Sequence, residues 1–172
     1  DAPVAVAPIT KVQIDGDVNL TDPNDWSDRK KEVLDFWDSA WSTPSPGDTN
    51  EINVMVIDWD ETYLYLGLQG IVWGNSWVLY LDTDFGGPNG ESDLTAIDTW
   101  ERGATFTAPG FLPDFQLGAY QHQSAFDGQS FWQITSPTTS VDLTAQIVAA
   151  FDPDHLNGYE GGTELAIPWD VL

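Results

Sequence analysis

The sequence predicts an all-β fold, an antiparallel β-sandwich of the jelly-roll or immunoglobulin-like kind. Apolar and polar residues alternate with a period of two in most segments, and helical periodicity is nearly absent. In addition, 11 prolines and 15 glycines separate the alternating segments at short intervals. A length of 172 residues is enough for one sizeable core and gives no reason for two domains. We therefore expect a single sandwich over residues 13–172.

The alternating segments give the expected strands in chain order. Residues 52–56 and 64–68 alternate on either side of the turn 58–62, which predicts a hairpin. Later strands are expected in four segments: 78–80, 115–119, 131–134 and 141–151. The last of these has the longest clean alternation, from Val141 to Phe151, and we expect one unbroken strand there. Each strand should have one face in the core and one face in water.

Two segments do not fit the strand pattern. Residues 27–37 are the one expected helix, because Ser27 is a suitable cap and Val33, Leu34 and Trp37 share a helical face. Residues 1–12 contain Ala, Val and Pro without alternation, which predicts an extended N-terminal arm.

Charge excludes some classes of partner. With 28 acidic and five basic residues, the surface field should repel nucleic acid and anionic membranes and attract cations. The sequence contains no run of about 18 apolar residues, so membrane insertion is not expected. The chain begins without methionine, which we interpret as the start of a mature protein after signal-peptide removal, located outside the cell or on its surface.

Three acidic loops are candidates for calcium, which prefers six to eight hard oxygen ligands. The loop after the expected strand 78–80 is the best candidate, and it offers Asp82, Asp84, Asn89, Glu91 and Asp93 among three glycines. The other two loops offer Asp15 and Asp17, near Asn19, Asp22 and Asp25, and Asp152 and Asp154. The alternative for each loop is a polar turn, because Asp, Asn and Gly form turns in any protein.

Aromatic side chains are the second set of candidate ligand-binding residues, since their faces stack on sugar rings. Trp73 and Trp100 are the first candidates because both lie in loop-like segments. The others are Trp77, Tyr120, Trp132 and Tyr159. The alternative is that these rings fill the core. Catalysis is not expected: there is no cysteine, neither histidine lies in a recognisable motif, and 28 carboxylates single out no pair.

Four segments occur in a familiar order: Ile14-Asp-Gly16 before Trp26, then residues 60–67, 78–84 and 164–169. Together they resemble the family 9 carbohydrate-binding modules and the related DOMON-like domains. The resemblance implies a β-sandwich with calcium sites in loops, sugar binding between aromatic side chains in many members, and no catalysis. Such domains usually continue for at least one further strand, so we expect this sandwich to lack its last strand and to expose an open edge.

Two functions follow as hypotheses. The first, narrowly favoured, is a structural subunit of a surface or filamentous assembly, in which the arm of one copy adds as a strand to the next copy, head to tail. The arm could instead pack on its own domain. The second is a polysaccharide-binding module of a secreted enzyme or adhesin.

Overall fold

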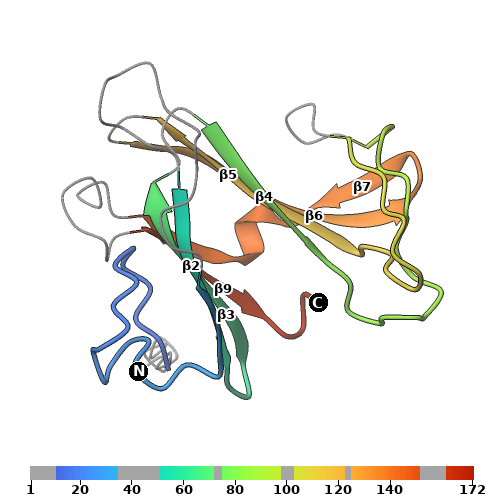
Figure 1. The fold of residues 1–172 in the computed structure, drawn as a ribbon. Coiled ribbons are helices and arrows are strands. Elements are labelled where there is room, and N and C mark those ends of the chain that lie inside the picture. The colour runs from blue at the N-terminus through green and yellow to red at the C-terminus, as the bar shows by residue number, and fades with distance from the viewer. Residues whose placement is uncertain (1–10, 35–50, 72–74, 98–102, 123–124, 152–161) are drawn as a thin grey trace, which may run out of the picture.

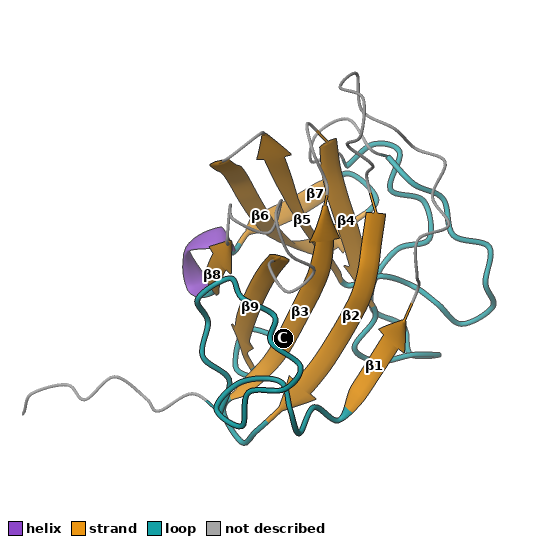
Figure 2. Ribbon diagram, turned by 60° about the vertical axis from the view of Figure 1, so that its left-hand side comes forward, coloured by secondary structure: helices purple, strands orange, loops and turns teal. Residues whose placement is uncertain are grey.

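The computed structural model describes residues 11–34, 51–71, 75–97, 103–122, 125–151 and 162–172, and it confirms an all-β architecture of two packed antiparallel sheets (Figure 1). The five-stranded sheet runs in the order β1 (Lys31–Leu34), β2 (Glu51–Trp59), β3 (Tyr63–Ile71), β9 (Gly162–Pro168) and β8 (Val148–Phe151). The four-stranded sheet runs β4 (Asn75–Leu81), β5 (Phe115–His122), β6 (Ala125–Ser136) and β7 (Thr139–Asp142). Figure 2 shows the first sheet face on, from β1 at one edge to β8 at the other.

The main core lies between the two sheets, where the period-two pattern predicted it. Leu66 of β3 and Leu165 of β9 face Phe115, Leu117 and Phe131 of the other sheet, and all five are nearly fully buried. The rings of Phe115 and Phe131 stack with their centroids 5.3 Å apart. The expected hairpin is also present, since β2 pairs with β3 from Glu51 to Trp59.

A second core covers the outer face of the five-stranded sheet, which the alternation had predicted to be wet. Val12, Val18 and Trp26 of the N-terminal segment pack there against strand residues such as Val56, and none of these four is exposed. Gly67 makes room for this layer, because a Cβ there would lie 2.6 Å from Val56 Cγ2 and 2.9 Å from the Trp26 ring. Local alternation cannot indicate that a distant segment folds over a strand.

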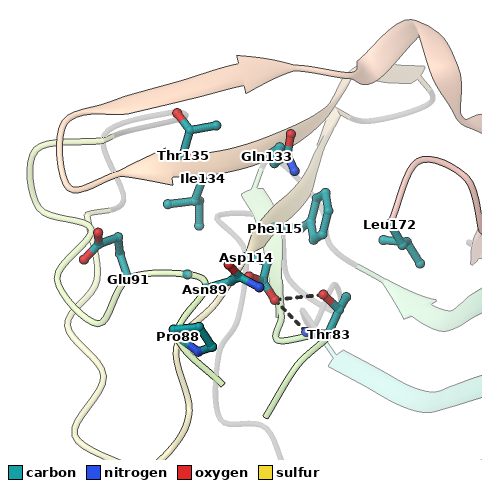
Figure 3. A pocket seen from close by; sticks show the side chains of 11 residues that line it. Thr83, Pro88, Asn89, Glu91, Asp114, Phe115, Gln133, Ile134, Thr135 and Leu172 are labelled. Atoms are coloured by element: carbon teal, nitrogen blue, oxygen red, sulfur yellow. Dashed lines mark hydrogen bonds between the residues drawn. The ribbon is translucent and has the colours of Figure 1, made fainter. Parts of the chain in front are cut away.

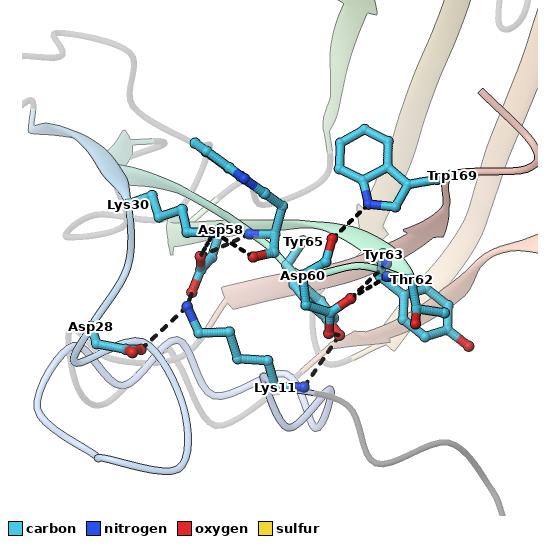
Figure 4. Close-up of polar contacts among 10 residues, drawn as sticks. Lys11, Asp28, Lys30, Asp58, Asp60, Thr62, Tyr63, Tyr65 and Trp169 are labelled. Carbon is cyan, nitrogen blue, oxygen red and sulfur yellow. Dashed lines mark hydrogen bonds and ion pairs between the residues drawn. The ribbon is translucent and has the colours of Figure 1, made fainter.

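Residues 11–26 form this layer, the N-terminal cover, and ion pairs fix one end of it (Figure 4). Lys11 Nζ contacts the fully buried carboxylate of Asp58 and lies 3.6 Å from Asp28 Oδ1. The Lys11 backbone N–H also donates to the Tyr65 hydroxyl at 3.2 Å, and that hydroxyl donates to Asp60 Oδ2 at 2.6 Å. Lys11 and Val12, which the sequence placed in the arm, are therefore attached to the sandwich, whereas residues 1–10 lie outside the described residues.

The expected helix at 27–37 is wrong over its described part. Lys31–Leu34 form β1, which pairs antiparallel with Ile57–Val54 of β2, and residues 35–37 lie outside the described residues. Val33 and Leu34 are 63% and 46% exposed. The apolar face that predicted a helix is therefore not buried here, and hydrogen bonding to an open sheet edge determines the conformation instead.

The expected single strand at 141–151 is also wrong, because the segment changes sheets. β7 pairs with β6 in one sheet, a 3-10 turn follows at Thr144–Gln146, and β8 then pairs with β9 in the other sheet. A straight strand cannot hydrogen-bond within both layers of a sandwich, so the chain has to turn between them.

The C-terminal strand β9 is not at an edge, since it pairs with β3 on one side and β8 on the other. Val171 and Leu172 then pack against the main core. Among the described residues, no helix has the length and apolar character needed to cross a membrane.

Candidate metal centre

The register of the antiparallel pair β4–β5 creates an acidic site at one end of the four-stranded sheet. Leu81, the last residue of β4, pairs with Phe115, the first residue of β5. Asp82 follows the first and Asp114 precedes the second, and the Asp114 backbone N–H donates to Leu81 O at 2.8 Å. Two carboxylates 32 positions apart in sequence are thereby placed side by side.

Asp84 completes a group of three carboxylates. Asp82, Asp84 and Asp114 each offer an oxygen, and these oxygens all lie within 4.8 Å of one another. It is the one such group of three or more acidic, histidine or cysteine side chains among the residues that the structure describes. Asp114 is 6% exposed, and the other two residues are half-buried.

Hydrogen bonds from the surrounding loops hold the three side chains in place. Asp114 Oδ2 accepts from the Thr83 backbone N–H at 2.7 Å and from its hydroxyl at 2.9 Å, as Figure 3 shows. Asp82 Oδ2 accepts from the Leu112 N–H at 2.9 Å, and Asp84 Oδ2 accepts from the Asn89 amide at 2.7 Å. Each carboxylate is therefore oriented before any ligand arrives.

Glycines give the loop the room that this arrangement needs. A Cβ at Gly87 would collide with the carboxylate of Asp84, and a Cβ at Gly90 would collide with the carbonyl of Leu112. Gly90 also has a φ of 78°, which L-residues with side chains rarely adopt. The glycines around Pro88 in the sequence thus have a steric role beside the carboxylates.

The donor set suits a hard divalent cation. At 4.8 Å, two carboxylates repel each other by about 1 to 3 kcal/mol at effective dielectric constants of about 80 to 20. None of the ion pairs formed by the described residues involves Asp82, Asp84 or Asp114; the basic partners in those pairs are Lys11, Arg29 and Lys30. Convergent carboxylate oxygens without a basic partner are the ligands that calcium takes in loops.

A pocket of about 430 Å³ opens beside the group and shares Asp114 with it (Figure 3). Its other polar walls include Thr83, Asn89 and Glu91, and its apolar walls include Phe115 and Leu172. Of the remaining predicted ligands, Asn89 and Glu91 therefore line this pocket, and Asn89 also bonds to Asp84 of the group. Asp93 is exposed, and its Oδ1 instead accepts from the N–H and hydroxyl of Thr95, which lowers the pKa of Asp93.

The first acidic loop lies at a different place, on the outer face of the five-stranded sheet. The N–H groups of Asp15 and Gly16 donate to Glu164 Oε2 at 2.8 and 2.7 Å, and Trp26 Nε1 donates to Glu164 Oε1 at 2.6 Å. Burial raises the pKa of Glu164 to about 7, against these hydrogen bonds, which lower it. Asp17 follows in the same loop, and its N–H donates to Asp15 Oδ1 at 3.0 Å. Asp152 and Asp154 lie outside the described residues.

Only three of the six predicted ligand-binding aromatic residues belong to the described part of the chain. Trp77 is 6% exposed and belongs to the main core, and Tyr120 and Trp132 are half-buried. Trp73, Trp100 and Tyr159 lie outside the described residues. Trp59 and Trp169, which are not among the predicted ligand-binding residues, are 38% and 42% exposed.

Sequence reasoning also missed Asp114. The available signal was strand pairing: once the expected strands 78–80 and 115–119 pair antiparallel, the end of the first lies beside the start of the second. Asp114, just before the second strand, then lies near the acidic residues that follow the first. Comparison of the chain with protein-family models, with curated proteins and with solved structures finds no match. The resemblance to family 9 carbohydrate-binding modules therefore stays a prediction from motifs.

Proposed function

We propose that this protein is a non-catalytic, calcium-stabilised β-sandwich module that works outside the cell. The observation that supports this function best is the convergence of Asp82, Asp84 and Asp114 within 4.8 Å, with no basic partner among the described residues. A calcium ion bound there would connect the end of β4 to the start of β5 and fix the loop between them. Millimolar extracellular calcium suffices even for a weak site of this kind.

Thermal unfolding with and without a calcium chelator tests the proposal. A ligand that binds only the folded state at 100 times its Kd stabilises it by about 2.7 kcal/mol. For a chain of 172 residues this corresponds to a rise in Tm of about 5 to 10 °C. We expect chelation to lower the Tm of the natural protein by this amount, and an unchanged Tm would contradict the proposal.

Matched variants locate the effect. Asp114→Asn should reduce the response to chelator by the share that this group contributes, because it removes the charge of the most buried carboxylate of the group. Asp93→Asn is the control in the same stretch of chain, since its carboxylate is exposed and bonds only locally to Thr95. An equal loss of response in both variants would mean that general charge, rather than this group, binds the ion.

A second candidate function is a structural subunit joined by strand addition, and the edges of the sandwich favour it. The edge strands β1, β7 and β8 carry exposed apolar side chains, with Val33 at 63%, Val141 at 45% and Val148 at 51%. Exposed apolar edges are sites where a further strand can pair. What pairs there is expected to be the N-terminal arm of a neighbouring copy.

Deletion of residues 1–10 tests this second function. The deletion stops before Lys11 and Val12 because both residues attach the N-terminal cover to the sheet. If the arm joins copies, electron microscopy and size-exclusion chromatography should show that the deletion removes polymers. Unchanged polymers after the deletion would rule out the arm as the segment that joins copies. Val33→Lys and Val148→Lys should then identify the accepting edge.

A further inference from the structure

An asparagine lies directly against the group of three carboxylates, and a glycine follows it in the chain. Asn89 Nδ2 donates to Asp84 Oδ2 at 2.7 Å, so the side chain of Asn89 is in contact with the group. In an Asn–Gly pair the glycine nitrogen can attack the preceding side-chain amide, because glycine has no Cβ that hinders the approach. Asn89–Gly90 therefore combines a reactive dipeptide with a place beside a candidate metal site.

The backbone nitrogen of Gly90 is available for this attack. The neighbouring N–H of Glu91 donates to Pro113 O at 3.1 Å, whereas the Gly90 N–H has no acceptor among the described residues. Asn89 is exposed and lines the pocket of about 430 Å³, so water reaches its side chain. The nucleophile, the amide that it attacks and the water needed afterwards are thus present together.

The reaction proceeds in two steps. The Gly90 nitrogen forms a bond to Asn89 Cγ and gives its proton to Nδ2 as the Cγ–Nδ2 bond breaks, which releases ammonia and leaves a cyclic imide. Water then opens the imide at one of its two carbonyl carbons. Opening at Cγ gives aspartate at position 89, and opening at the backbone carbonyl carbon gives isoaspartate. Either product has a carboxylate in place of a neutral amide, and no oxidant or reductant takes part.

We propose that Asn89 is a self-modification site, at which spontaneous loss of ammonia adds a fourth carboxylate to the group and strengthens its binding of calcium. The gain in binding rests on the proposed function, whereas the modification itself does not. The new carboxylate replaces an amide that donates to Asp84 Oδ2 at 2.7 Å, so a hydrogen-bond donor becomes a like charge. A bound cation removes that repulsion, and a higher ligand charge tightens calcium sites.

The loop should tolerate the two products differently. Isoaspartate lengthens the main chain immediately before Gly90, whereas aspartate keeps its length. Gly90 has a φ of 78°, and a Cβ there would lie 2.0 Å from the Leu112 carbonyl oxygen. Because the main chain is this closely packed, we expect isoaspartate to disturb the loop and aspartate to be the product that joins the group.

Peptide mapping by mass spectrometry tests the modification on the whole chain, incubated folded at neutral pH and, as a reference, unfolded in urea. We expect Asn89 to gain the mass that exchange of an amide for a carboxyl brings, in the folded sample as well. Asn89→Gln is the matched control and should stay unchanged at this position, because a glutamine side chain has to close a larger ring. Asn157→Gln removes the other Asn–Gly pair of the sequence, so that the mass of this variant reports position 89. Conversion in the unfolded sample alone would overturn the inference.

Calorimetric titration with calcium tests the gain in binding. Asn89→Asp reproduces the aspartate product, and we expect its Kd to be about tenfold lower than that of the natural protein, because one more charged ligand is present. Equal Kd values would overturn this part of the inference and leave the proposed function standing. No calcium binding by either protein would overturn the proposed function and the gain in binding together, while conversion of Asn89 in the mass spectra would still support the modification.

Discussion

Glu164 should be among the most sensitive positions of the chain, because one buried side chain joins the N-terminal cover to β9. It is fully buried and accepts three hydrogen bonds, from the N–H groups of Asp15 and Gly16 and from the Trp26 indole. The first two partners lie 149 and 148 positions away in sequence. Glu164→Ala would leave all three donors without an acceptor.

The expected loss of stability follows from these donors. A buried donor left unpaired costs about 1 to 3 kcal/mol, so three donors amount to about 3 to 9 kcal/mol. A water molecule that enters the vacated space restores part of this, which brings the expected loss to about 3 to 5 kcal/mol. Since a domain has about 5 to 15 kcal/mol in total, this variant should lose a large share of its stability.

Glu164→Gln is the matched variant, since it keeps the volume and one acceptor oxygen. Its carbonyl can still accept from the two backbone donors, but its amide then faces the Trp26 N–H, donor against donor. We expect an intermediate loss of about 1 to 2 kcal/mol.

Urea unfolding followed by tryptophan fluorescence and circular dichroism measures both variants. Chelator should be present throughout, so that any bound ion does not contribute to the difference. A loss below about 1 kcal/mol for Glu164→Ala, or equal losses for the two variants, would refute the idea that these hydrogen bonds hold the cover.

Three further changes test other parts of the structure. Gly67→Ala should lower the free energy of unfolding by about 1 to 3 kcal/mol in urea titrations, because its Cβ meets Val56 and Trp26; no loss would mean that the cover shifts freely. Lys11→Met should also destabilise, by about 1 to 3 kcal/mol, because it removes the closest cation from the buried carboxylate of Asp58, and Lys30 at 3.9 Å compensates only in part. In chelator, stability should fall as pH rises from about 4.5 through 7, because burial raises the pKa of Glu164 from 4.5 to about 7 and the folded state then holds the proton more tightly than the unfolded state. That contribution is complete below pH 4.5 and lost above 7, so Glu164→Gln should show a flatter pH profile.

Much of the fold could be predicted from local pattern, and the errors have a common cause. Alternation identified β2 and β3 and parts of β4, β5 and β6, because a strand with one buried face has a period of two wherever it lies. It did not identify β9, which contributes Leu165 and Ile167 to the main core. The same reasoning failed at residues 31–34 and 141–151. In both segments pairing with another strand, rather than the local pattern, determines the conformation.

The candidate site divides in the same way. The sequence alone indicated an acidic, glycine-containing loop after a core strand, and the structure places Asp82 and Asp84 together there. Asp114 joins them only through the register of β4 and β5. The burial of Asp25, whose Oδ1 has no hydrogen-bond partner, is likewise not indicated by its place in an acidic loop of the sequence.

The sequence by itself determined the class of fold, the strongly acidic charge and the loop in which carboxylates are concentrated, because each of these depends on composition or on neighbours along the chain. The tertiary structure decided which carboxylates meet, which sheet face is covered and which side chains lose contact with water. These depend on contacts between residues tens to more than a hundred positions apart, such as Asp15 with Glu164, and no local pattern contains them.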